Sequence, residues 1–142
     1  MPEQGEIEDA LADAVNDHDL EALIRCYSPR AVTVMPGGVA EGRDQIRSYY
    51  AQFLEAFPDL RVTIWSRLER SDDISHEWAF AATHTGPFLV PGAVLPPTGR
   101  EIRVRACSVR TVEDGLILSH RLYFDQLELL SQLGVGLDLQ GR

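Results

Sequence analysis

Helical spacing of hydrophobic residues dominates the first part of the chain. The first stripe has apolar positions three or four residues apart, which predicts an amphipathic helix: Ile7, Leu11, Ala14 and Val15. Asp19 is a predicted N-cap for a short second helix over residues 20–27, and a longer helix is predicted over residues 42–57. Residues 32–35 form a predicted short strand between them, because a Pro-Gly-Gly turn follows.

A two-residue period replaces the helical one after residue 60. Alternating apolar and polar positions predict four strands, over residues 60–70, 74–85, 100–112 and 116–125. Tight turns at 71–73 and 113–115 join antiparallel neighbours, and a loop rich in Gly and Pro, residues 86–99, interrupts the sheet. A last helix is predicted over residues 126–134. Helices followed by a meandering antiparallel sheet predict an α+β domain with the helices on one face of a curved sheet.

Composition is typical of one compact domain spanning residues 1–142. The chain is 44% hydrophobic, and its formal charge of −9 disfavours nucleic acid and anionic membrane surfaces as partners. No window reaches the ~18 apolar residues of a membrane span, and the N-terminus is acidic, unlike that of a signal peptide. We therefore expect a cytoplasmic protein.

The sequence lacks the residues that several kinds of catalysis need. All 13 basic residues are arginine, so no lysine can form a Schiff base. The four histidines are not at metal-ligand spacing, Cys26 and Cys107 are predicted to be reduced thiols, and no dinucleotide, P-loop or serine-nucleophile motif is present. We expect neither a cofactor nor a metal.

The strand period also predicts which side chains share a face. Trp78, Phe80 and His84 fall on one face of their strand. In the last strand, strict alternation places Arg121, Tyr123 and Asp125 on one side and Leu118, His120, Leu122 and Phe124 on the other, barring a β-bulge. A sheet that is apolar on both faces predicts helices on one face and a second subunit on the other, hence a homodimer.

Two polar residues are candidates for chemistry. Asp125 lies at a strand-to-helix junction, where it is either the N-cap of the last helix or a general acid/base at the mouth of an apolar pocket. His84 ends an aromatic stripe, where it is either a satisfied core histidine or the partner of a carboxylate. The residues alone leave both alternatives open.

Short motifs distributed over residues 5–135 together resemble the SnoaL-like polyketide cyclases. The motifs are Asn-Asp-His-Asp-Leu at 16–20, Gly-Arg-Asp-Gln-Ile at 42–46, Phe-Pro-Asp-Leu at 57–60, Thr-His-Thr-Gly-Pro-Phe at 83–88, Leu-Pro-Pro-Thr-Gly-Arg at 95–100, Asp-Gly-Leu-Ile at 114–117, Asp-Gln-Leu at 125–127 and Leu-Leu-Ser-Gln-Leu-Gly at 129–134. The resemblance implies the cone-shaped α+β barrel of the nuclear transport factor 2-like superfamily, with a pocket between the helices and the concave sheet.

The same resemblance implies an activity. Characterised cyclases of the family close the last ring of an aromatic polyketide by an intramolecular aldol condensation without a cofactor, and the acid/base aspartate maps onto Asp125, with His84 as its partner. We expect a hydrophobic substrate, with an aromatic polyketide as one candidate, in a cavity large enough for fused rings. The predicted ligand-binding side chains are Trp78, Phe80, Tyr123, Arg121, Tyr49, Tyr50 and Phe53.

Departures from the family pattern keep other functions open. Arg30 replaces an aspartate, Arg121 replaces a large aromatic residue, and Leu122 stands where an acidic residue is usual. Arg121 would depress the pKa of Asp125 if the two paired, or would bind an anionic group of the substrate. The alternatives are an epoxide hydrolase or a ketosteroid-isomerase-like enzyme on the same fold, and a non-catalytic small-molecule-binding or assembly domain.

Overall fold

The computed structural model describes residues 4–90 and 92–136. Three helices and a hairpin form the first part: α1 (Gln4–Asn16), α2 (Leu20–Arg25), β1 (Tyr27–Met35), β2 (Gly38–Glu41) and α3 (Gly42–Ala56). The remaining elements are β3 (Arg61–Arg70), β4 (Asp73–Thr83), β5 (Phe88–Val90), β6 (Ala93–Leu95), β7 (Glu101–Glu113), β8 (Leu116–Phe124) and α4 (Gln126–Gln132). The predicted α+β class is confirmed.

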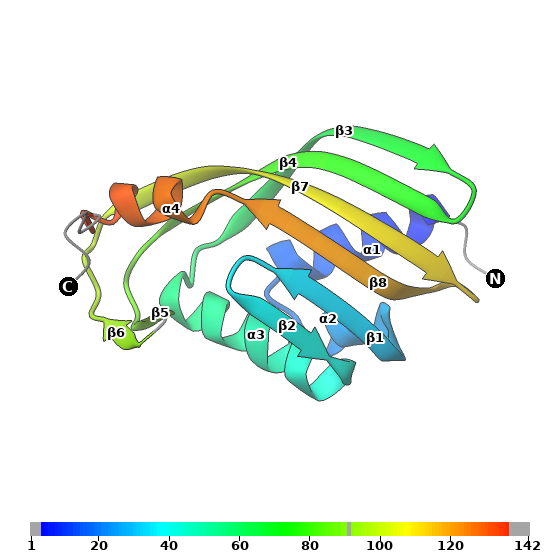
Figure 1. Cartoon of the computed structure of the whole chain (residues 1–142), viewed down its shortest axis with the longest axis horizontal. Coiled ribbons are helices and arrows are strands. Elements are labelled where there is room, and N and C mark those ends of the chain that lie inside the picture. The colour runs from blue at the N-terminus through cyan, green and yellow to red at the C-terminus, as the bar shows by residue number, and fades with distance from the viewer. Residues whose placement is uncertain (1–3, 91, 137–142) are drawn as a thin grey trace.

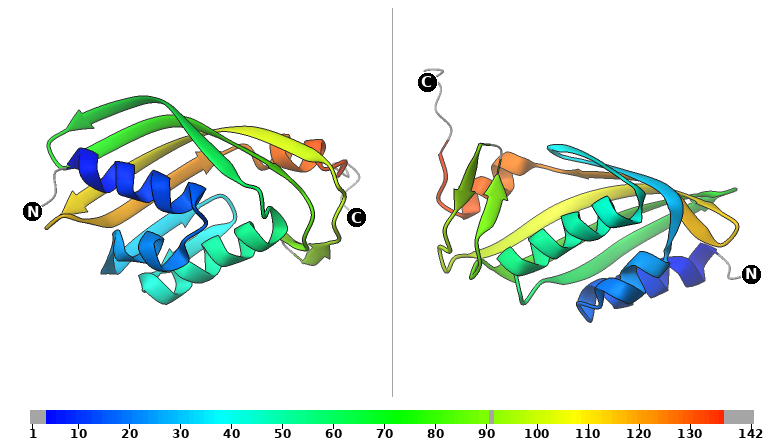
Figure 2. Two further views of the ribbon diagram at one scale, coloured as in Figure 1. Left: turned by 180° about the vertical axis from the view of Figure 1, so that it is seen from behind. Right: turned by 90° about the horizontal axis from the view of Figure 1, so that it is seen from below.

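Six strands make one strongly curved sheet in the order β2-β1-β8-β7-β4-β3. All neighbours are antiparallel except β1 and β8, which run parallel. Figures 1 and 2 show α1, α2 and α3 on one face of this sheet, while β5 and β6 form a separate hairpin at one end. The loop predicted at residues 86–99 therefore contains this hairpin, in which Phe88 pairs with Leu95.

Specific polar contacts fix the helices over the sheet. The Asn16 side chain at the end of α1 donates to the Val62 carbonyl and accepts from the Val62 amide, at 3.2 and 2.7 Å. At the other end of the molecule, the amides of Thr85 and Gly86 donate to the carbonyl of Ala56, the last residue of α3. A Cβ at Gly86 would lie 2.0 Å from the Glu55 carbonyl oxygen, so only glycine allows this approach. These contacts set the spacing between helices and sheet.

A β-bulge in β8 reverses the predicted faces of the residues that follow it. Ser119 pairs with Thr111, but Ile117 pairs with Val112, so Leu118 is an extra residue between the two pairs. Because of it, Ile117 and His120 both face the helices, and the following inward positions are Leu122 and Phe124. The prediction that Arg121, Tyr123 and Asp125 share the inward face is wrong. The bulge shifts the alternation by one residue, as strict periodicity cannot foresee.

No helix in the described part of the chain is long and apolar enough to cross a membrane.

Candidate active site

A cavity of about 80 Å³ lies between α1, α3 and the concave face of the sheet. Most of its wall is apolar, contributed by α1, α3, β3, β4 and β8. The cavity is smaller than the roughly 300–1,000 Å³ of typical ligand pockets, so this conformation does not provide the predicted space for a fused-ring ligand.

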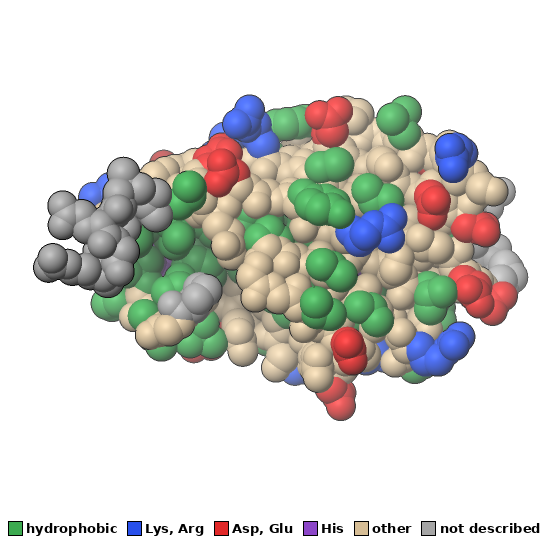
Figure 3. Space-filling model, viewed as in Figure 1, with side chains coloured by type: hydrophobic (Ala, Val, Ile, Leu, Met, Phe, Trp, Pro, Cys, Tyr) green, Lys and Arg blue, Asp and Glu red, His purple; other side chains and the backbone are tan. Residues whose placement is uncertain are grey.

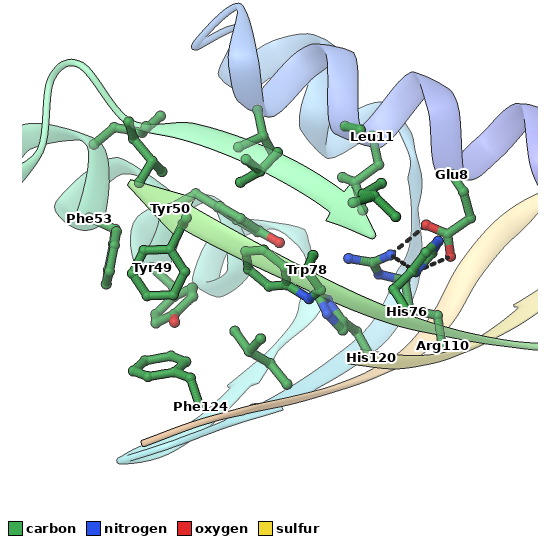
Figure 4. A pocket seen from close by; sticks show the side chains of 18 residues that line it. Glu8, Leu11, Tyr49, Tyr50, Phe53, His76, Trp78, Arg110, His120 and Phe124 are labelled. Carbon is green, nitrogen blue, oxygen red and sulfur yellow. Dashed lines mark hydrogen bonds and ion pairs between the residues drawn. The ribbon is translucent and has the colours of Figure 1, made fainter. Parts of the chain in front are cut away.

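Five of the predicted ligand-binding side chains line this cavity: Tyr49, Tyr50, Phe53, Trp78 and Phe80. Helical spacing brings the three α3 residues to the helix side of the cavity, and two-residue alternation brings the two β4 residues to the sheet side. Phe53 packs edge-on against Phe80, with ring centroids 5.6 Å apart, and Phe80 does the same with Phe124 at 5.5 Å. Figure 4 shows Tyr49, Phe53 and Phe124 together at one end of the cavity. This end offers an aromatic surface to a ligand.

The structure places Asp125, Tyr123 and Arg121 outside the cavity. Asp125 is exposed and is the N-cap of α4, where its Oδ1 accepts from the amides of Leu127 at 2.8 Å and Glu128 at 3.2 Å. Tyr123 is 56% exposed, and Arg121 donates to the Ser119 hydroxyl at 3.2 Å. The bulge at Leu118 explains all three positions, because it turns these side chains to the outer face.

His84 has structural contacts and does not meet Asp125. Its ring is buried against Phe57 and Phe88, with centroids 5.4 and 6.2 Å away. Its Nδ1 accepts from the Thr98 amide at 3.2 Å and lies 2.9 Å from the Thr98 hydroxyl. His84 therefore anchors the segment after the β5–β6 hairpin to the body of the molecule. The two residues predicted to act together lie in separate environments.

A buried ionic cluster closes the other end of the cavity (Figure 4). Arg110 on β7 donates through Nη1 to Glu8 Oε2 on α1 and, at 3.1 Å, to His76 Nδ1 on β4. Arginine can only donate, so His76 Nδ1 accepts and the neutral ring carries its proton on Nε2. Glu8 Oε1, His76 Nε2 and Arg110 Nε have no hydrogen-bond partner among the described residues. The cluster thus has unused acceptor and donor capacity at a cavity wall.

A chain of hydrogen-bonded polar groups links three residues of the cavity wall: Tyr50, His120 and Trp78. The Tyr27 hydroxyl lies 2.9 Å from that of Tyr50 and 3.0 Å from His120 Nδ1. His120 Nε2 lies 3.3 Å from the Ser108 hydroxyl, which accepts from Trp78 Nε1 at 2.9 Å. Each hydroxyl can both donate and accept, so the direction of the bonds between Tyr50 and Ser108 can reverse, whereas Trp78 Nε1 always donates.

Burial determines the protonation of these groups. Desolvation raises the pKa of Glu8, and the charge of Arg110 and its hydrogen bond oppose the rise. Desolvation, assisted by Arg110, lowers the pKa of His76 to about 4 and that of His120 well below its usual value. Desolvation also raises the pKa of Tyr50, with Arg110 as the main opposing influence. At neutral pH both imidazoles and both phenols of the cavity wall are uncharged.

The sequence contained signals for the cavity residues that the sequence-based prediction missed. Glu8 falls on the apolar stripe of the first helix, one turn before Leu11 and two before Val15. His76 shares the inward face with Trp78, and Arg110 follows alternating buried positions of β7. A charged or imidazole side chain on an apolar face was the available signal. The sequence-based prediction placed His120 on the outer face because strict alternation did not include the bulge, which turns this residue inward.

In the described part of the chain, no three His, Cys, Asp or Glu side chains are grouped as metal ligands would be. Cys26 and Cys107 are free thiols, buried and half-buried respectively.

The curved sheet with its helices is the fold of nuclear transport factor 2-like proteins. A family model for SnoaL-like polyketide cyclases matches residues 5–133, and the chain belongs to that family. A comparison with curated proteins found no match.

Solved structures share the fold over almost the whole chain. IdmH from Streptomyces antibioticus, a candidate polyketide cyclase, is 27% identical, with a TM-score of 0.78 over 94% of this chain and 100% of its own. AclR from Streptomyces galilaeus, a candidate hydroxylase, is 24% identical, with a TM-score of 0.81 over 95% and 83%. A candidate SnoaL-like cyclase from Jannaschia sp. CCS1 is 21% identical, with a TM-score of 0.82 over 94% and 92%.

Proposed function

We propose that the protein is a cofactor-independent enzyme of the polyketide cyclase type, which moves a proton on an apolar carbonyl compound inside the cone. The observation that carries the proposal is a carboxylate, Glu8, at the wall of an apolar cavity with one oxygen unpartnered. Glu8 is the one carboxylate that contributes to the described wall of this cavity. It takes the role that the family resemblance assigned to Asp125.

Glu8 acts as proton acceptor in this mechanism. Its Oε1 removes a proton from the carbon beside a ligand carbonyl, and the C–H electrons form a carbon–carbon double bond while the carbonyl oxygen becomes negative. In a cyclisation, this enolate carbon attacks a second carbonyl carbon of the same molecule, and the new alkoxide takes the proton back from Glu8. Raised basicity from burial favours the first step, since the carboxyl pKa moves toward that of the carbon acid.

Tyr50 and Arg110 stabilise the enolate. The Tyr50 hydroxyl lies at the cavity wall and is held by Tyr27, and Figure 4 shows it directed from α3 toward His120 and Arg110. A preorganised O–H donor beside a guanidinium charge favours negative charge on a bound carbonyl oxygen. The chain through Tyr27, His120 and Ser108 orients that donor without adding a charge.

Hydrogen exchange on a simple ketone tests the proposal without the natural substrate. In heavy water the protein should accelerate deuterium uptake at the carbon beside the carbonyl of acetone, a ketone much smaller than a fused-ring compound, measured by NMR. Asp125→Asn should be as active as wild type because Asn caps a helix about as well as Asp. Limonene oxide, incubated in parallel, should remain unhydrolysed. Hydration of the epoxide without exchange would favour the epoxide hydrolase, and inertness toward both compounds would favour a non-catalytic binding domain. A ketosteroid-isomerase-like enzyme would also give exchange, and would differ by shifting a double bond instead of closing a ring.

We also propose that the outer face of the sheet pairs with a second copy of the chain. Figure 3 shows hydrophobic side chains in the middle of this face. Val34, Val39 and Tyr123 are 43%, 55% and 56% exposed there, and Val34 pairs with both Val39 and Arg121. Leu122 and Phe124, which strict alternation placed on the side of the strand opposite Tyr123, instead face the cavity.

Introducing charge on this face should dissociate the dimer. Tyr123→Glu and Val34→Glu should both shift the protein to a monomer, because each would bury a carboxylate against an apolar surface. Val94→Glu, on the separate β5–β6 hairpin, is the matched control and should remain dimeric. Sedimentation velocity at micromolar concentration measures the difference, and a monomeric wild-type protein would contradict the pairing.

A further inference from the structure

A second hollow lies on the other side of α3 from the inner cavity. This outer groove encloses about 720 Å³ and is bounded by the β1–β2 turn, α3, β5 and the first residue of α4. Figure 3 shows the molecule hollowed in this region, between α4 and the β5–β6 hairpin. The groove is thus formed by segments that are far apart in the sequence.

Tyr49 is the one described residue that lines both the inner cavity and the outer groove. Its ring packs edge-on against Tyr50, with centroids 5.6 Å apart, and more obliquely against Phe53 at 6.3 Å. Its hydroxyl makes no hydrogen bond to the described residues, unlike that of Tyr50, which is held by Tyr27. A rotamer change of Tyr49 therefore breaks packing contacts but no hydrogen bond to a described residue.

The two spaces differ in chemistry. The inner cavity has an aromatic end, whereas the groove combines an apolar part, which includes Leu89 and Val90 of β5, with amide and hydroxyl side chains. These polar side chains lie on α3 and α4, namely Gln45, Ser48, Gln52 and Gln126. Asp44 is the one charged side chain in the described groove wall, and it is negative. A neutral group with several hydroxyls or amides fits this wall, whereas an anionic group would be repelled.

We propose that one ligand occupies both spaces, with its apolar ring system in the inner cavity and a neutral, hydroxyl-rich end in the outer groove, and that Tyr49 swings aside to admit it. This inference rests on the proposed function, because it takes the inner cavity as the ligand site. The volumes are consistent with it: the inner cavity of about 80 Å³ is too small for a drug-sized ligand by itself, and the groove beside it adds about 720 Å³. The substrate class is therefore an elongated, uncharged molecule that is apolar at one end and hydroxylated at the other.

A pair of probes that differ only at one end tests the groove. The probes are 2-naphthol and 2-naphthyl β-D-glucoside, and binding is followed by the fluorescence of the probe. The glucoside should bind wild type more tightly than the naphthol does. Gln52→Ala should weaken glucoside binding by about two- to tenfold, the worth of one neutral hydrogen bond, and should leave naphthol binding unchanged.

Variants of Tyr49 test the gate. Tyr49→Ala should speed association of both probes, because the barrier between the two spaces is removed. Tyr49→Phe should not speed association as Tyr49→Ala does, because the ring that separates the two spaces remains.

The outcomes separate this inference from the proposed function. If Gln52→Ala weakens both probes equally or neither, the groove is not part of the ligand site, while naphthol binding would leave the inner site intact. Association rates unchanged in Tyr49→Ala would overturn the gate. Failure of both probes to bind would overturn this inference, and deuterium exchange on acetone would still decide the proposed function separately.

Discussion

Replacing Glu8 by glutamine should lower the rate of proton exchange on a bound ketone by about 10²- to 10⁴-fold, the usual contribution of a general base. Glutamine has nearly the same shape, and its carbonyl oxygen can still accept the bond from Arg110 Nη1. It cannot take up a proton. The loss should therefore appear in kcat at saturating ketone, with probe binding in the inner cavity largely retained.

The pH dependence provides a second readout of the same variant. Glu8 is active as base only when ionised, and burial raises its pKa, so the acidic limb of the wild-type profile should lie above the pKa of an ordinary glutamate. That limb should vanish from the residual activity of Glu8→Gln. Full activity in Glu8→Gln, in a protein shown to be folded, would remove Glu8 from the mechanism.

Removing the cation of the buried cluster should have the largest effect on stability. Arg110→Met should lower the free energy of unfolding by about 3–5 kcal/mol, because it leaves the Glu8 carboxylate buried without a counter-charge. The double variant Glu8→Gln with Arg110→Met should recover much of this loss, since no buried charge then remains. Urea unfolding at neutral pH measures both.

Acid should abolish the loss of stability in Arg110→Met, because Glu8 is then protonated and carries no charge. In Arg110→Met the folded-state pKa of Glu8 lies well above its unfolded value, since burial disfavours the ion. Below the unfolded pKa the carboxyl is protonated in both states, and no cost arises. The cost grows as pH rises above that value. A loss independent of pH would indicate that packing of the Arg110 stem, not charge, is responsible.

Periodicity predicted most of the elements and one wall of the site. Trp78 and Phe80 were placed correctly, because the part of β4 that carries them pairs without interruption with β7. The last strand failed at one residue: the bulge at Leu118 turned Asp125 and Tyr123 outward and His120 and Leu122 inward. Local sequence carries little information about a bulge, because it depends on pairing with the neighbouring strands.

The ionic cluster was missed for a different reason. Glu8, His76 and Arg110 lie on three elements separated by many residues, and each alone looks like an ordinary polar side chain. Their meeting depends on where α1 lies over the sheet, which the contact between Asn16 and Val62 determines. Hydrophobic patterns reveal such a site only if every charged residue on a predicted apolar face is considered as a candidate functional residue.

The pairing of Glu8 with Arg110 also determines how much charge the apolar cavity must hold during the proposed reaction. Arginine stays protonated throughout, so the resting cavity contains one ion pair and no net charge from the cluster. When Glu8 takes a proton, its negative charge disappears as the same charge arises on the ligand oxygen. The guanidinium of Arg110 then faces an enolate in place of a carboxylate. Proton transfer thus exchanges one ion pair for another inside the cavity, and no uncompensated charge is created where water is largely excluded.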